Sequence, residues 1–215
     1  MNVELKKGRS ALTKFLDATY RDTQWSASAL HTWLAGRKLP YLIDGNRDTL
    51  LQKAYAGTPH TLIVGTARIS AKAYRFKLYQ YDGAAYRPID PEAVDVSLPV
   101  LFKPLGTPLP ESSYIASDAD FVDYITELMG GFAIPPFVKR MRQGRKYLLL
   151  GLRLTRDTER MVLSDIVFGH GGGWALIPNA TDKEKRFLDK LGFELVPADV
   201  ADFLAAAEAG TLQAA

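Results

Sequence analysis

The stretch KYLLLGLRLTRDTERMVLSDIVFGHGGGWALIPN, residues 146–179, decides the predicted fold. It contains an apolar strand, a helix over residues 156–168 and a second apolar strand, and the same alternation continues to about residue 208. Continuous apolar runs are typical of strands that are buried on both faces. Strands that alternate with helices indicate a parallel sheet. We therefore predict an α/β protein with a mainly parallel sheet of five or six strands and helices on both faces.

The same kinds of element precede this stretch. Strands are predicted at residues 41–43, 60–69 and 96–103, with a helix between the first two that begins near residue 47. Residues 1–37 form a helical N-terminal segment, with amphipathic helices at 10–20 and 26–37 that we expect to pack against the sheet. We expect one domain over the whole chain, 1–215, because this length suits a single α/β domain.

Local turn and cap signals sharpen this prediction. Residues 70–95 alternate around Asp82-Gly83, a strong hairpin pair, which predicts an antiparallel hairpin inserted at the sheet edge. Ser117 with Asp120, and Thr181 with Glu184, have capping-box spacing and predict two helix starts. The glycine-rich segment at 168–174 follows a helix instead of a strand, so we interpret it as a flexible connection and not as a phosphate loop.

Composition limits the possible chemistry. The chain has 215 residues, a formal net charge of +3 and no cysteine, which excludes disulfides, thiol nucleophiles and cysteine-ligated metals. Its three histidines, at positions 31, 60 and 170, lack a paired motif, so we expect no metal site. No apolar run reaches membrane-spanning length and no signal-peptide core is present. We expect a cytoplasmic protein that does not contact a membrane.

The candidate site residues follow from a general rule for parallel sheets. Ligands bind outside the carboxyl ends of the strands, where following helix N-termini favour anions, so a nucleotide suits this rim. The residues at these strand ends are Asp44, Gly45, Asn46, Arg47, Asp48, Lys103, Pro104, Leu105, Gly106, Gly151, Arg153, Arg156 and Asn179.

Structural roles remain open for the same residues. Asn46 suits a helix N-cap, and Asp48 suits the positive end of a helix dipole. Lys103 suits a solvated strand end, and Arg153 suits a surface ion pair.

Four segments in order resemble a known family: GRKLPYLIDGNRDTLLQKAYAG, VLFKPLG, SYIASDADFVDYI and PPFVKRMRQGRKYLLLGLRLTRDTERMV. Their order and spacing are similar to those of the bacterial sirtuin-like domains associated with phage defence. The resemblance covers about residues 25–205, and no single motif within it is specific. It implies a Rossmann-like fold, and in active members it implies cleavage of the nicotinamide–ribose bond of NAD.

Carried over to this chain, the resemblance places the family's catalytic asparagine at Asn46, with Asp48 supporting the same loop. The candidate cofactor-binding residues are Gly45, Lys103, Gly106, Gly151, Arg153 and Asn179.

Two departures from the family pattern bear on catalysis. The family's Lys-Leu-His-Gly segment is Lys-Pro-Leu-Gly here, so Leu105 stands where the catalytic histidine is expected. The glycine-rich first strand and turn that approach the dinucleotide have no counterpart before Asn46. Loss of a positioned acid or base typically costs about 100- to 10,000-fold in rate. We therefore expect a degenerate member of the family.

Three functions remain in competition. The first is a non-catalytic or weakly nucleotide-binding component of a bacterial or phage conflict system, acting through a protein partner or a second copy. The second is an NAD hydrolase that uses Asn46 and an unrecognised base. The third is a nucleic-acid-associated module that uses the basic run KRMRQGRK, residues 139–146. No aromatic residue interleaves with these charges, so nucleic acid is the least expected partner.

Overall fold

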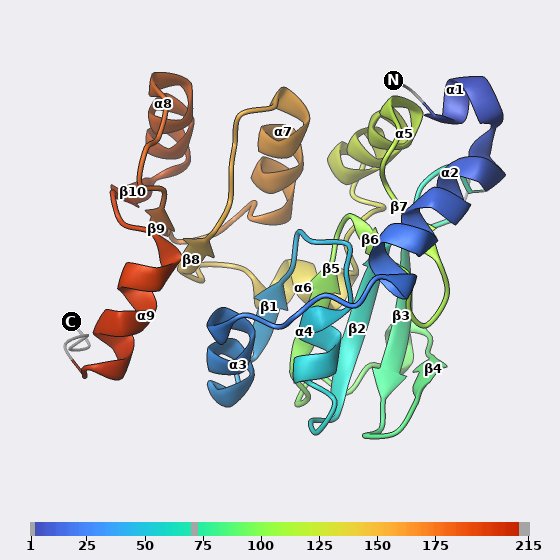
Figure 1. Ribbon diagram of the computed structural model, residues 1–215, viewed down its shortest axis with the longest axis horizontal. Helices are drawn as coiled ribbons and strands as arrows, with labels where there is room; N and C mark the ends of the chain where they lie inside the picture. Colours follow the sequence, from blue (N-terminus) through green and yellow to red (C-terminus); the bar gives the residue numbers. More distant parts are fainter. Residues whose placement is uncertain (1–2, 70–72, 211–215) are drawn as a thin grey trace. The chain divides into compact units, whose positions relative to one another are not determined.

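The computed structural model describes residues 3–69 and 73–210 and shows a mixed α/β protein (Figure 1). The chain forms two compact units, Met1–Phe137 and Val138–Ala215. Each unit has its own sheet, and each is described by itself below. Whether the whole chain behaves as one domain stays a prediction.

The sheet of the first unit has five strands, in the order β1-β5-β2-β3-β4. Strands β1, β5 and β2 are parallel to one another, whereas β2, β3 and β4 pair antiparallel. The strands are β1 (Tyr41–Ile43), β2 (His60–Gly65), β3 (Phe76–Tyr81), β4 (Tyr86–Pro88) and β5 (Val100–Lys103). The parallel part places the carboxyl ends of β1, β5 and β2 at one edge.

The predicted edge hairpin is confirmed for the described residues, since β3 and β4 form it and residues 70–72 lie outside the described part. Its turn is closed by Asp82, whose Oδ1 accepts hydrogen bonds of 2.9 Å from the backbone N–H groups of Ala84 and Ala85. Gly83 adopts a φ of 100°, a conformation that glycine reaches without steric cost.

One face of this sheet packs on helices α3 (Ala29–Gly36) and α4 (Leu50–Ala54). Figure 1 shows α4 in front of the central strands. The core there joins α4 to all three central strands, and α3 packs against it. Its buried members are Leu51, Tyr55, Leu62, Val64, Tyr79 and Leu101. The opposite face is also buried, as Ile63 and Phe102 have no exposed surface. Burial on both faces explains why these strands are continuous apolar runs.

Beyond the end of β5 the chain turns back into a small antiparallel hairpin, β6 (Gly106–Thr107) and β7 (Ser113–Tyr114). The long helix α5 (Asp118–Met129) follows, and its capping box of Ser117 and Asp120 is confirmed. The short helix α6 (Pro136–Met141) begins at a proline and includes the start of the basic run at 139–146. A short 3-10 turn, η2 (Pro91–Ala93), follows β4.

The N-terminal segment is helical, as predicted. It comprises α1 (Val3–Lys7), α2 (Arg9–Asp17), a π-helical turn η1 (Ala18–Asp22) and α3. In α2, Leu12 and Leu16 pack on Tyr114 of the β6–β7 hairpin. Of the two predicted helices, α3 therefore packs against the main sheet, whereas α2 packs on the hairpin.

The second unit has a three-stranded, entirely parallel sheet in the order β10-β9-β8. Strands β8 (Tyr147–Leu150), β9 (Gly173–Leu176) and β10 (Phe193–Val196) alternate with helices α7 (Asp157–Ile166), α8 (Asp182–Leu191) and α9 (Val200–Glu208). This alternation is the one that the sequence predicts. The capping box of Thr181 and Glu184 at the start of α8 is confirmed as well.

Glycines of the 168–174 segment pack closely against neighbouring backbone. A Cβ atom on Gly173 would lie 1.9 Å from the backbone oxygen of Tyr147, and one on Gly171 would lie 2.5 Å from that of Gly144. The Tyr147 N–H also donates a 3.0 Å hydrogen bond to the Gly172 carbonyl. Glycines here let two backbone segments run against each other.

The sheet organisation differs from the prediction in one respect. A single parallel sheet of five or six strands is expected, but the structure has a five-stranded mixed sheet and a separate parallel sheet of three. The strand patterns identify the strands of these two sheets and miss the short β6 and β7. They carry no information on which strands are neighbours. Within the described residues, no helix is both long and apolar enough to cross a membrane.

Candidate functional site

The carboxyl ends of β1 and β5 meet at a buried ion pair. Because these strands are parallel neighbours, Asp44, which follows β1, lies beside Lys103, the last residue of β5. The Lys103 Nζ donates to Asp44 Oδ2 at 2.6 Å and to the backbone carbonyl of Asp48 at 2.8 Å. Lys103 is completely buried, and only 8% of Asp44 is exposed. The Lys103 ammonium therefore binds protein oxygens at the rim and is not a solvated strand end.

The loop between β1 and α4 is organised by two aspartates. Asp44 Oδ1 accepts a 2.9 Å hydrogen bond from the Asn46 N–H, and Asp48 Oδ1 accepts one of 2.9 Å from the Leu50 N–H. Helix α4 begins at Leu50 with Thr49 as its N-cap, so Asn46 is not the helix cap. The Asn46 side chain is exposed and makes no hydrogen bond to a described residue.

The Lys-Pro-Leu-Gly segment leads into the β6–β7 hairpin. A Cβ atom on Gly106, whose φ is 85°, would lie 2.1 Å from the Ser113 carbonyl oxygen. A Cβ atom on Gly65, at the end of β2, would lie 2.0 Å from the Pro104 carbonyl oxygen. Leu105 is partly buried, and its carbonyl accepts a 3.1 Å hydrogen bond from the Ile115 N–H. Close packing of the backbone therefore requires glycine at positions 65 and 106.

The predicted site residues fall in both units. Gly45, Asn46, Asp48, Lys103 and Gly106 belong to the first unit, where the ion pair connects Lys103 to the 44–48 loop.

Gly151, Arg153 and Asn179 belong to the second unit, and all three are exposed. Gly151 has a φ of 65°, which glycine adopts without strain.

The loop that contains Gly151 and Arg153 is held by two buried charged side chains, which bind the backbone N–H and carbonyl of Leu154. Glu184 Oε1 accepts a 2.9 Å hydrogen bond from the Leu154 N–H. Arg160 donates to the Leu154 carbonyl and pairs with Asp157.

The basic run at 139–146 does not form a continuous charged face. Arg142 is buried and donates to the carbonyl oxygens of Asp165 and Ile166 at 2.6 and 2.7 Å. Lys146 lies over the Trp174 ring, with its Nζ 5.3 Å from the ring centroid. At least these two of its charges have contacts within the second unit, which weakens the case for nucleic acid.

The histidines also have local contacts. His31 Nδ1 accepts from the Ser28 N–H at 3.1 Å in the capping box of α3. His170 stacks on Phe193 with ring centroids 4.8 Å apart. His60 is fully buried, with Thr58 O and the Tyr86 hydroxyl 2.7 and 2.9 Å from its two ring nitrogens. Among the described residues, no group of three or more acidic or histidine side chains is arranged to hold a metal.

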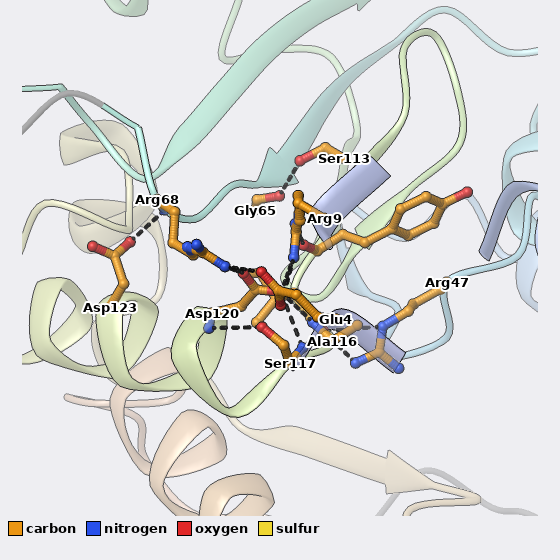
Figure 2. A network of polar contacts seen from close by, with 12 residues as sticks. Glu4, Arg9, Arg47, Gly65, Arg68, Ser113, Ala116, Ser117, Asp120 and Asp123 are labelled. Atoms are coloured by element: carbon orange, nitrogen blue, oxygen red, sulfur yellow. Dashed lines mark hydrogen bonds and ion pairs between the residues drawn. The ribbon is translucent and has the colours of Figure 1, made fainter. Parts of the chain in front are cut away.

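A network of polar contacts in the first unit surrounds Asp120, as Figure 2 shows. This residue is fully buried at the start of α5, and its Oδ2 accepts from the N–H groups of Ala116 and Ser117 at 3.1 and 3.0 Å. Arg9 donates to the same oxygen and, through its second terminal nitrogen, to Tyr114 O at 2.8 Å. Helix α2 is thus tied to the N-terminus of α5.

Arg68 continues this network from the loop after β2. Its guanidinium contacts the carboxylate of Glu4 on α1 and lies 4.0 Å from Asp120 Oδ1. The backbone N–H of Arg68 donates a hydrogen bond of 2.8 Å to Asp123 Oδ2. Asp123 also binds the buried Arg75 through two hydrogen bonds of 2.7 and 2.9 Å. The N-terminal helices α1 and α2 and the loop after β2 therefore meet at the N-terminus of α5.

The carboxylates of this network are held in their charged forms. Burial raises the pKa of Asp120, but the Ser117 N–H and the Arg9 guanidinium outweigh it and lower this pKa. The Ser117 hydroxyl and Arg68 lower the pKa of Glu4, although burial opposes them. Glu4 and Asp120 are therefore both anionic at neutral pH.

Sequence reasoning found Asp120 only as a helix cap and missed Arg9, Arg68 and Glu4. These three residues are remote from α5 in the chain, and no local pattern connects them. Arg68 adopts a left-handed φ of 57°, a conformation that the sequence does not reveal.

Comparison with known proteins adds no relative. No family model matches the chain, and no curated protein matches it.

Proposed function

We propose that this protein is a degenerate sirtuin-like α/β protein that acts by binding and not by catalysis, as a component of a bacterial or phage conflict system. The proposed fold is Rossmann-like, with the glycine-rich first strand of the family missing. The support for kinship is the ordered set of four segments in the sequence. The support for lost catalysis comes from the strand-end rim.

The buried Lys103–Asp44 pair is the observation that carries the proposal. It joins the ends of β1 and β5, where ligands bind in parallel sheets, and the Lys103 ammonium has two protein oxygens as partners. In active members of the family, a histidine after the strand that matches β5 does the acid–base chemistry. Leu105 stands at that position here and cannot accept a proton. A rim whose lysine and aspartate are bound to protein groups, and whose histidine position holds a leucine, suits a binding protein.

The test is release of nicotinamide from NAD by the purified protein. We expect no more than a trace rate from the wild type, and no gain from Leu105→His, because one histidine does not restore the rest of a dinucleotide site. Turnover by the wild type that Asn46→Ala abolishes would refute the proposal. A switch to robust hydrolysis in Leu105→His would also refute it.

A second candidate function, NAD hydrolysis through Asn46, is favoured by one feature. The Asn46 side chain is exposed beside the strand ends, and it has no hydrogen-bond partner among the described residues. It is therefore available to a ligand, and the same nicotinamide assay separates the two candidates.

A further inference from the structure

The N-terminus of α5 holds an internal anion. The carboxylate of Glu4, carried by α1, contacts the Arg68 guanidinium and has its Oε2 atom 3.8 Å from Arg9 Nη1. The Glu4 Oε2 atom is buried and has no hydrogen-bond partner among the described residues. Figure 2 shows Glu4 converging on Arg9, Arg68 and Asp120. Two guanidinium groups and a twelve-residue helix thus present donors and positive potential to one carboxylate.

A second feature of this place is an unused acceptor. Asp120 has no exposed surface, and its Oδ1 has no hydrogen-bond partner among the described residues, although Arg68 Nη1 lies 4.0 Å away. A buried carboxylate oxygen without a donor is costly, so a ligand that brings a hydroxyl group would be favoured there. Glu4 cannot provide one, because it is itself ionised.

We propose that the place occupied by the Glu4 carboxylate is a binding site for a phosphate group that keeps one proton, and that such a phosphate displaces Glu4 and releases α1. The phosphate oxygens take the guanidinium groups of Arg9 and Arg68, which match oxyanions well. The phosphate O–H donates to Asp120 Oδ1. Inorganic hydrogen phosphate has this combination of charge and donor at neutral pH, whereas sulfate is fully ionised and has no proton to donate.

Helix α1 is suited to release. It has five residues, and a helix of this length is not stable in water without tertiary contacts. Helix α2 keeps anchors of its own when α1 leaves, because Leu12 and Leu16 pack on Tyr114. Phosphate and the Glu4 carboxylate therefore compete for one site. A change that weakens the Glu4 contact should raise the affinity for phosphate, and phosphate binding should weaken the Glu4 contact.

The site lies within the first unit and does not rest on the proposed function. Calorimetric titration of the full chain with inorganic phosphate, sodium sulfate or sodium chloride at equal ionic strength tests it directly. Hydrogen exchange of the peptide 3–8 reports the release of α1 in the same solutions. We expect phosphate alone to bind and to increase exchange in α1. Equal effects of sulfate or chloride, or no effect of phosphate, would overturn the proposal.

Variants test the competition itself. Glu4→Gln removes the internal anion with little change of shape, so we expect phosphate affinity to rise about 10-fold, within the usual range of coupling between sites. Arg68→Gln should abolish binding. Glu92→Gln, at an exposed glutamate of η2, is the matched control and should leave affinity unchanged. An unchanged affinity in Glu4→Gln would refute the competition, and nicotinamide release, measured separately, tests the proposed function.

Discussion

The buried pair of Lys103 and Asp44 should make an unusually large contribution to the stability of the first unit. In Lys103→Met the aliphatic part of the side chain is retained, but the Asp44 carboxylate keeps, among the described residues, only its hydrogen bond from the Asn46 N–H. Leaving one charge of a buried pair without its partner typically costs about 3–5 kcal/mol. The lost hydrogen bond from this ammonium to the Asp48 carbonyl adds about 1.5–3 kcal/mol.

Two comparisons isolate the cause of this loss. Lys103→Met combined with Asp44→Asn removes both charges and keeps an acceptor for Asn46, so we expect its stability to lie within about 2 kcal/mol of the wild type. Lys77→Met is the matched control. Lys77 pairs with Glu111, but their side chains are 42% and 56% exposed, and such pairs contribute about 1 kcal/mol at most.

Stability is best measured where the pair lies. Hydrogen exchange of β1 and β5 peptides across a urea series gives the free energy of unfolding of the first unit, whatever the second unit does. The same loss in Lys103→Met and Lys77→Met would refute the argument that burial makes the Lys103 pair strong. A double variant no more stable than Lys103→Met would show that the loss comes from packing and not from an unpaired charge.

Three further predictions concern stability. Burial lowers the pKa of His60 below its ordinary value of 6.5, so the unfolded chain binds the proton at a higher pH than the folded chain does. The free energy of unfolding should therefore fall as the pH drops below about 6.5. Urea unfolding of His60→Phe should lose this pH dependence. Gly106→Ala should cost about 2 kcal/mol or more in thermal unfolding, because φ is 85° and the facing backbone is too close. Gly45→Ala, which has open space, should cost under about 1 kcal/mol. Thr181→Ala removes the acceptor for the Glu184 N–H and should lower the free energy of unfolding of the second unit by about 1 kcal/mol. Unchanged hydrogen exchange in α8 would contradict this prediction.

Short-range signals in the sequence determined most elements of this protein. The capping boxes at Ser117 and Thr181 start their helices as predicted, and Gly192 ends α8 in a left-handed conformation with a φ of 76°. Asp82-Gly83 makes the hairpin, and the strand at 41–43 has the predicted bounds. Each signal acts over a few residues, and the groups involved meet whatever the rest of the chain does.

Tertiary structure alone decided which elements become neighbours and what the strand-end residues do. Lys103 meets an aspartate 59 positions away, and Arg9 meets Asp120 across 111 positions. No local pattern encodes such pairings, because they depend on strand order and on the division of the strands between two sheets. The sequence marks Asn46, Asp48 and Lys103 as rim residues, but only the fold makes the lysine the partner of a buried carboxylate. A charge that is buried in a low-dielectric interior needs an opposite charge or hydrogen-bond partners, and for Lys103 the folded chain supplies both.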